Sequence, residues 1–163
     1  EGMRLVRENL PTAVRNGKDI AARSHMMAAA GMGATAFQKG LGAIHSLSHP
    51  VGAVLDTHHG LTNAVVMPYV LAFNRPAIEA KLTRVARYLG LADASFAGFM
   101  DWVLALRREI GIPDTLKDLG MQANQIDRFA EMAAVDPTAG GNPVKAGVPE
   151  MKKMYEASLS GAL

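Results

Sequence analysis

The stretch that decides the fold reads G-L-G-A-I-H-S-L-S-H-P-V-G-A-V-L-D-T-H-H-G-L-T-N-A-V-V-M-P-Y-V-L-A-F-N and covers residues 40–74. It holds four of the five histidines of the chain. Its second half is almost wholly apolar over three helical turns and carries Pro68, and such an apolar stretch is typical of a helix buried in a protein core. The stretch therefore predicts a central core helix that follows directly after a concentration of histidines.

The remainder of the chain is also predicted to be helical. Its apolar residues recur at intervals of three and four, and no segment shows sustained alternation of apolar and polar residues. Gly40 and Gly42 interrupt this pattern, and Arg75-Pro76 is expected to begin a new helix. The fold class is therefore all-α, a multi-helix bundle. The expected helices span about residues 2–14, 18–37, 45–55, 58–74, 75–89, 95–110, 123–134 and 149–159.

The helix expected over residues 18–37 is rich in alanine and glycine, although glycine lowers helix propensity. Such small residues would let another helix approach closely, so we expect this face to be buried. The lone histidine of this helix, His25, is expected to be packed or to lie at the surface.

Composition excludes several classes of function. The chain has 163 residues, of which 49% are hydrophobic and 20% charged, with a formal net charge of +2. No basic run indicates nucleic acid as a partner, and no apolar run is long enough to predict a role in a membrane. Without cysteine, disulfides and thiolate chemistry are excluded, and any metal must be held by nitrogen and oxygen ligands. These features favour a cytoplasmic globular protein.

The spacing of three histidines suggests a metal site. His45 and His49 are four residues apart, so on a helix they project from the same face. His59 follows beyond a turn at Asp56-Thr57, where the chain has room to reverse and to return beside the first helix. At the start of a helix, the macrodipole would favour the neutral imidazole that a cation needs. The same i, i+4 pair also occurs by accident in helices that bind no metal.

Two motifs make the chain resemble the iron-containing alcohol dehydrogenases. The first is G-L-G-x-x-H-x-x-x-H-P-x-G-A, followed by H-G and a long apolar helix with a proline; it is matched by residues 40–74. The second is D-P-T-A-G-G-N-P, residues 136–143, which resembles the D-P-x-x-x-x-N-P-R of the family except that Val144 stands in place of the Arg. The resemblance covers essentially the whole chain and points to the C-terminal helical domain of that family, with its dehydroquinate synthase-like fold.

The resemblance implies roles for particular residues. His45 and His59 would be two of four ligands of Fe(II) or Zn(II), whereas His49 would lie near the ion without ligating it. His49 would then relay the alcohol proton, or it would only shape the pocket. Phe37 and Leu41 would line the substrate pocket, although core packing is an equal alternative for both.

The resemblance also implies that part of the enzyme lies outside this chain. The other two ligands of the family are an Asp and a His four residues apart, and no Asp-x-x-x-His precedes His45 here. The α/β domain that binds NAD or NADP is absent as well. Residues 1–163 are therefore expected to be a C-terminal metal-binding domain, truncated at its N-terminus and inactive alone. The expected substrate is a small alcohol or aldehyde, and a homodimer is a family-level expectation.

Two alternatives remain open at this point. In the first, the chain is a self-contained non-haem metal protein that uses His45, His59 and Asp56 as a two-histidine, one-carboxylate site. Against it, Asp56 is also well placed to cap the helix that follows. In the second, the chain is a non-enzymatic helical interaction module whose histidines only pack or cap.

Overall fold

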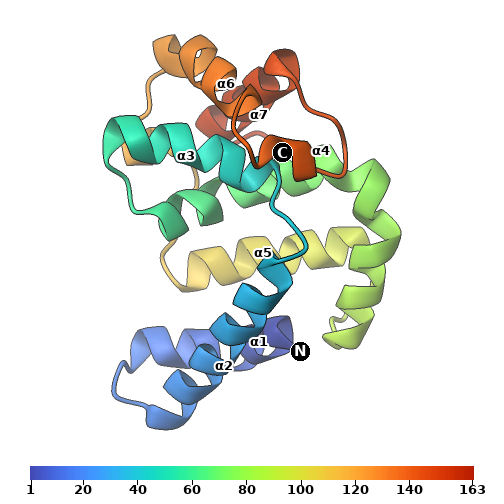
Figure 1. Ribbon diagram of the computed structural model, residues 1–163. Helices are drawn as coiled ribbons and strands as arrows, with labels where there is room; N and C mark the ends of the chain where they lie inside the picture. The colour runs from blue at the N-terminus through green and yellow to red at the C-terminus, as the bar shows by residue number, and fades with distance from the viewer. The chain divides into compact units, whose positions relative to one another are not determined.

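The computed structural model describes residues 1–163 and confirms the all-α fold class (Figure 1). The chain divides into two compact units, one formed by residues 1–40 and 81–110 and the other by residues 41–80 and 111–163. No helix is both long enough and apolar enough to cross a membrane. The α-helices are α1 (Gly2–Arg15), α2 (Ile20–Phe37), α3 (Ala43–Leu55), α4 (His59–Tyr88), α5 (Phe96–Glu109), α6 (Ile126–Ala134) and α7 (Val148–Ser160).

The longest helix corrects one prediction. Arg75-Pro76 does not begin a new helix, because α4 runs through both residues without a break. A proline inside a helix leaves the carbonyl four residues earlier without its partner N–H. That carbonyl belongs to Ala72, and both Ala72 and Pro76 are exposed, so water can satisfy it. The Arg75 guanidinium also donates to the Glu79 carboxylate one turn further along the helix.

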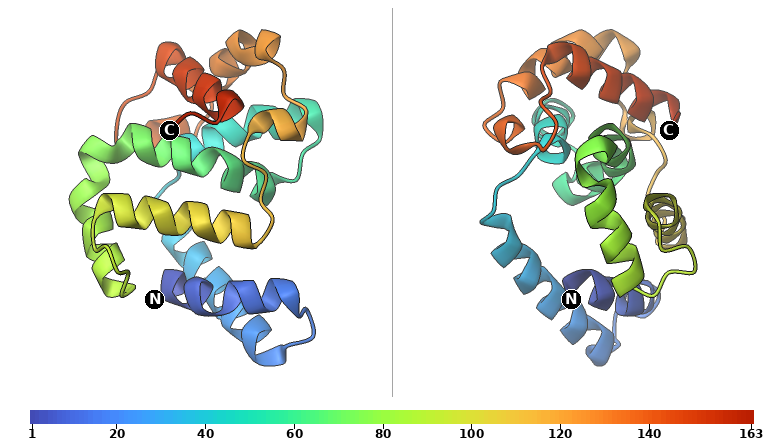
Figure 2. Two further views of the ribbon diagram at one scale, coloured as in Figure 1. Left: turned by 180° about the vertical axis from the view of Figure 1, so that it is seen from behind. Right: turned by 90° about the vertical axis from the view of Figure 1, so that its right-hand side faces the viewer.

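In the first unit, α1 and α2 pack against each other and lie side by side in every view (Figures 1 and 2). The carboxylate of Asp19 caps α2 by accepting a hydrogen bond from the Ala22 backbone N–H at 2.9 Å. The small-residue face of α2 is buried only around Ala22 and Ala29. The prediction of a buried face thus holds only for a narrow strip, because Ala30, Gly31 and Gly33 are exposed.

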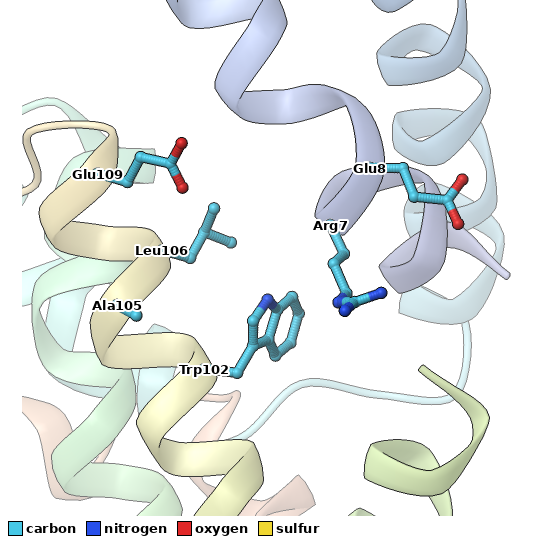
Figure 3. A pocket seen from close by; sticks show the side chains of 6 residues that line it. All are labelled: Arg7, Glu8, Trp102, Ala105, Leu106 and Glu109. Carbon is cyan, nitrogen blue, oxygen red and sulfur yellow. The ribbon is translucent and has the colours of Figure 1, made fainter. Parts of the chain in front are cut away.

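The same unit contains α5, whose start was predicted correctly. Ser95 caps it by accepting a hydrogen bond from the Gly98 backbone N–H at 3.1 Å. A pocket lies between α1 and α5 and is lined by Arg7 and Glu8 of α1 and by Trp102 and Leu106 of α5. The Arg7 side chain lies opposite the Trp102 ring, whereas Glu8 points away from α5 (Figure 3). None of the candidate site residues lines this pocket.

The core of the second unit is formed by α3, the first part of α4, α6 and α7. Val65, Val66 and Val70 of α4 are buried, which confirms the prediction of a central core helix. Helices α6 and α7 lie side by side in both views of Figure 2. The other buried members of this core are Ala43, Leu47, Val51, Leu116, Met121, Phe129, Ala130, Ala133, Met151, Met154 and Tyr155.

Tyr155 of α7 joins the core to the backbone of α3. Its hydroxyl donates to the Leu47 carbonyl at 2.6 Å, and its ring packs against Phe129 with the ring centroids 6.1 Å apart. Burial of the side chain strongly raises the pKa of Tyr155, so the phenol stays protonated and remains a donor. This contact fixes α3 against α7.

We predict that Tyr155→Phe lowers the free energy of unfolding by about 1 kcal/mol, because a buried hydrogen bond is lost while the ring is kept. Urea denaturation measures the change. Tyr88→Phe is the matched control: the Tyr88 hydroxyl donates to Glu1 at 2.7 Å, but the residue is 58% exposed. Its substitution should change the free energy by less than about 0.5 kcal/mol. Equal losses in the two variants would contradict this account of the core.

Candidate metal centre

Helix α3 separates a buried face from a face that carries histidines. Ala43, Leu47 and Val51 follow one another at intervals of four and are completely buried. His45 and His49 have the same spacing but are offset by two residues, which places them about 200° around the helix from the buried row. The packing of the apolar row into the core therefore turns both imidazoles outward on the same side of α3.

The structure brings the third predicted histidine to the same place. The chain reverses at Asp56, which ends α3 in the left-handed conformation with φ 53°. The imidazole of His59 consequently lies against those of α3, with its ring centroid 5.3 Å from that of His45 and 5.4 Å from that of His49. The rings of His45 and His49 are 5.8 Å apart. The predicted chain reversal is confirmed, and three imidazoles form one cluster.

The start of α4 corrects the prediction that Asp56 caps this helix. His58 takes that role, since its Nδ1 accepts a hydrogen bond from the Leu61 backbone N–H at 3.3 Å. Asp56 is exposed at the end of α3 instead. A residue that adopts φ > 0 to close one helix does not have the extended backbone of an N-cap residue, and this is why the two roles exclude each other here.

Asn63 of α4 contacts two members of the histidine cluster. Its Nδ2 is 3.0 Å from Nε2 of His59 and 3.4 Å from Nε2 of His45. Its Oδ1 is buried and has no hydrogen-bond partner. The Nε2 atoms of both predicted ligands therefore converge on one point, which an amide nitrogen occupies in this structure. Such convergence of two imidazole nitrogens is what a shared cation requires.

The surroundings of His45 favour its neutral form. Burial lowers the pKa of His45, and the neighbouring imidazoles of His59 and His49 lower it further. The Asp136 carboxylate acts in the opposite direction but does not outweigh them. Because only the neutral imidazole offers a lone pair to a metal, this environment suits a ligand.

The chain by itself offers no complete set of metal ligands. No group of three or more His, Cys, Asp or Glu side chains in the chain is arranged to hold a metal ion. The other predicted residues are placed as follows. His25 is exposed on α2, Phe37 is half-exposed at the end of the same helix in the first unit, and Leu41 is half-buried at the start of the second unit. Substrate-pocket roles for Phe37 and Leu41 stay predictions.

The irregular segment 136–144 contacts the histidine cluster through Asp136. Nδ1 of His49 is 2.8 Å from Oδ2 of Asp136, whose side chain is only 13% exposed. The other carboxylate oxygen accepts hydrogen bonds from the backbone N–H and the hydroxyl of Thr138. Burial raises the pKa of Asp136, but the hydrogen bonds from Thr138 and His49 outweigh it, so the pKa of this carboxyl lies below its usual value. Asp136 is therefore a carboxylate at neutral pH.

The same segment ties α3 to α4 through Asn142. Its Oδ1 accepts from the Ala43 backbone N–H at 3.1 Å and from Nδ2 of Asn74 at 2.9 Å. Its Nδ2 donates to Oδ1 of Asn74 and to the Val144 carbonyl, each at 2.7 Å. Gly42 is required beside it, because a Cβ there would lie 2.9 Å from Oδ1 of Asn142. The Val144 side chain takes no part in this network, since only its backbone accepts.

Sequence reasoning missed Asn63, Asn74, Asp136, Thr138 and Asn142. The motif that contains the last three was noticed, but a contact between Asp136 and His49 spans 87 residues, and no helical spacing predicts it. A signal for Asn63 was available, because it lies four residues after His59 and thus on the same face of α4.

Gly140 and Gly141 test how closely segment 136–144 packs against the backbone of Leu41. At Gly141, an added Cβ would lie 2.0 Å from the Leu41 carbonyl oxygen, whereas at Gly140 it would meet nothing within 4 Å. We predict that Gly141→Ala lowers the free energy of unfolding by about 1–3 kcal/mol, because one backbone must move away from the other. Gly140→Ala should change it by less than about 0.5 kcal/mol. Urea denaturation measures the free energy of unfolding of both variants. Equal losses would contradict the close packing of Gly141 against the Leu41 backbone.

The all-α fold and the paired imidazoles of His45 and His59 place the chain among helical domains with a candidate metal centre. Comparison with known proteins identifies the family. Residues 1–159 match the Fe-containing alcohol dehydrogenase family, C-terminal. The chain belongs to this family, as the sequence motifs predicted.

Individual relatives agree. The chain is 37% identical to 4-hydroxybutyrate dehydrogenase of Cupriavidus necator, with 93% of this chain and 41% of that protein covered. It is 36% identical to NAD-dependent methanol dehydrogenase of Bacillus methanolicus, with 98% and 44% covered. Among solved structures, 1,3-propanediol oxidoreductase is similar with a TM-score of 0.92 at 31% identity, over 97% of this chain and 43% of that one. The chain thus spans less than half the length of the relatives it matches.

Proposed function

We propose that the chain is the helical metal-binding part of an NAD- or NADP-dependent alcohol dehydrogenase. In this proposal His45 and His59 are two of the four ligands of an Fe(II) or Zn(II) ion. The observation that carries the proposal is the convergence of the two Nε2 atoms on the amide nitrogen of Asn63, 3.4 Å and 3.0 Å away. Membership of the Fe-containing alcohol dehydrogenase family supports it.

The two imidazoles fit such an ion in kind. Two neutral imidazoles supply half of a tetrahedral ligand set, and the remaining two ligands would come from a segment outside this chain. A divalent ion held there would act as a Lewis acid toward an alcohol or carbonyl oxygen. The amide nitrogen of Asn63 would have to move away from the two Nε2 atoms to admit the ion.

His49 has the chemistry of a proton acceptor beside this pair. Oxidation of an alcohol removes a hydride from carbon, which a bound nicotinamide accepts, and a proton from oxygen. The ring of His49 stacks at 22° on that of His59, so it lies beside the proposed ligands without converging on Asn63 as they do. His49 would take the hydroxyl proton and pass it to solvent, to which its side chain is 39% exposed.

Relatives suggest the substrate class. Methanol, 4-hydroxybutyrate and 1,3-propanediol, the compounds after which related dehydrogenases are named, all carry a primary alcohol on a short chain. We therefore propose a short primary alcohol, or the corresponding aldehyde, as substrate. Phe37 and Leu41 stay candidates for the residues that line its pocket.

The self-contained alternative has less support. It needs His45, His59 and Asp56 to form one ligand group, and no group of three such residues in the chain is arranged to hold a metal. Asp56 is instead exposed at the left-handed end of α3. The interaction-module alternative has less support because the relatives of the chain are dehydrogenases.

Anaerobic calorimetric titration of the chain with Fe(II) and with Zn(II) tests the proposal. We predict one weak site per chain, because only two of four ligands are present. The double variant His45→Ala, His59→Ala should bind more than about tenfold more weakly, since even groups outside the first ligand set contribute that much to metal affinity. His25→Ala is the control and should bind like the wild type, because His25 is a lone exposed histidine on α2.

Two outcomes would contradict the proposal. Equal binding by the wild type and the double variant would leave the histidines without a metal role. Tight binding that is lost in Asp56→Ala would favour the self-contained site. Activity is tested separately with the protein encoded by the reading frame that contains this chain, which should oxidise short primary alcohols with NAD or NADP and lose that activity in His45→Ala.

A further inference from the structure

The hydrogen bonds of the Asp136 carboxylate are divided strictly between its two oxygens. Oδ1 accepts two donors, the backbone N–H of Thr138 at 2.8 Å and the Thr138 hydroxyl. Oδ2 faces only Nδ1 of His49, also at 2.8 Å. Because Thr138 is two residues away in the same turn, it fixes the orientation of the carboxylate by contacts that do not involve the imidazole. The side chain is only 13% exposed, so water does not compete strongly for these bonds.

We propose that Asp136 is a positioning residue that holds His49 in the tautomer with its proton on Nδ1. A carboxylate only accepts hydrogen bonds, so a 2.8 Å contact with a neutral imidazole requires Nδ1–H. The lone pair is then on Nε2, the other edge of the ring. That edge is the one available to a substrate hydroxyl, so Asp136 would decide that His49 accepts a proton rather than donates one. This inference rests on the proposed function, in which His49 receives the alcohol proton.

The same contact stabilises His49 after it has accepted the proton. The transfer breaks the substrate O–H bond, forms an Nε2–H bond, and leaves an imidazolium whose Nδ1–H still points at the carboxylate. The positive charge therefore forms opposite a negative charge that is already oriented. The hydrogen bond made by one ring nitrogen of a histidine sets which nitrogen carries the proton.

Asp136→Asn reverses the hydrogen-bond polarity with almost no change in shape. Thr138 presents two donors to the position of Oδ1, so the amide oxygen of the asparagine must take that position. Its NH₂ group then faces Nδ1 of His49, which has to become an acceptor. The variant should therefore move the proton of His49 from Nδ1 to Nε2. Asp136→Glu keeps a carboxylate and should keep the proton on Nδ1.

Nitrogen-15 NMR of the chain, with labelled histidine rings, reads this tautomer directly because the protonated and unprotonated ring nitrogens have well-separated shifts. At neutral pH or above, we expect Nδ1–H for His49 in the wild type and in Asp136→Glu, and Nε2–H in Asp136→Asn. The ring-nitrogen shifts of His25 serve as the reference for an exposed histidine. Nε2–H in the wild type, or the same tautomer in the wild type and Asp136→Asn, would overturn the inference. The wild-type spectrum decides even if a variant fails to fold.

Kinetics test the consequence in the dehydrogenase encoded by the complete reading frame. Asp136→Asn should lower kcat by about tenfold or more, because a general base contributes about a hundredfold or more and this variant gives it the wrong tautomer, and Asp136→Glu should restore part of the loss. KM should change little, since Asp136 does not touch the substrate. An unchanged kcat in Asp136→Asn would overturn the inference. The NMR experiment needs neither metal nor substrate, so failure of metal binding contradicts the proposed function, and a wrong tautomer contradicts only this inference.

Discussion

The side-chain amide of Asn142 is the contact on which the arrangement of the histidines depends. It accepts from the first N–H of α3 and exchanges two hydrogen bonds with Asn74 of α4, while it also donates to the Val144 carbonyl. Asn74 is 5% exposed, so these bonds are protected from water. A buried amide that lost them would be left unsatisfied, at a cost of about 1–3 kcal/mol for each group. One side chain thus joins both helices that carry the imidazoles.

The opposite face of α3 explains why the histidines can be polar and partly exposed without weakening the fold. Leu47 and Val51 are fully buried, and the Tyr155 hydroxyl bonds to the backbone of the same helix. Ser46 and Ser48 flank the apolar row and are buried as well, with each hydroxyl bonded to a carbonyl three residues earlier. Packing and chemistry therefore use different faces of one helix, and changes at His45 or His49 should leave the core intact.

Much of this architecture could be predicted from local sequence. The helices follow from apolar spacing, the shared face of His45 and His49 from the i, i+4 rule, and the arrival of His59 from the turn at Asp56. Local rules failed where the outcome depends on solvent or on distant residues. Helix α4 continues through Pro76 because the unpaired carbonyl is exposed, and most of α2 is exposed because it packs against α1 only along a narrow strip. The contact of Asp136 with His49 links residues far apart in the chain, and no periodicity encodes it.

X-ray absorption at the zinc edge of the chain loaded with one Zn(II) tests the central claim most directly. Two of the nearest scatterers should be imidazole nitrogens at about 2.0–2.1 Å, recognised by the outer atoms of their rings, and the remaining ones should be solvent oxygens. His49→Ala should leave the imidazole count at two, whereas His59→Ala should reduce it to one. A count that falls in His49→Ala, or a spectrum without imidazole scattering in the wild type, would contradict the assignment of His45 and His59 as the metal ligands of this chain.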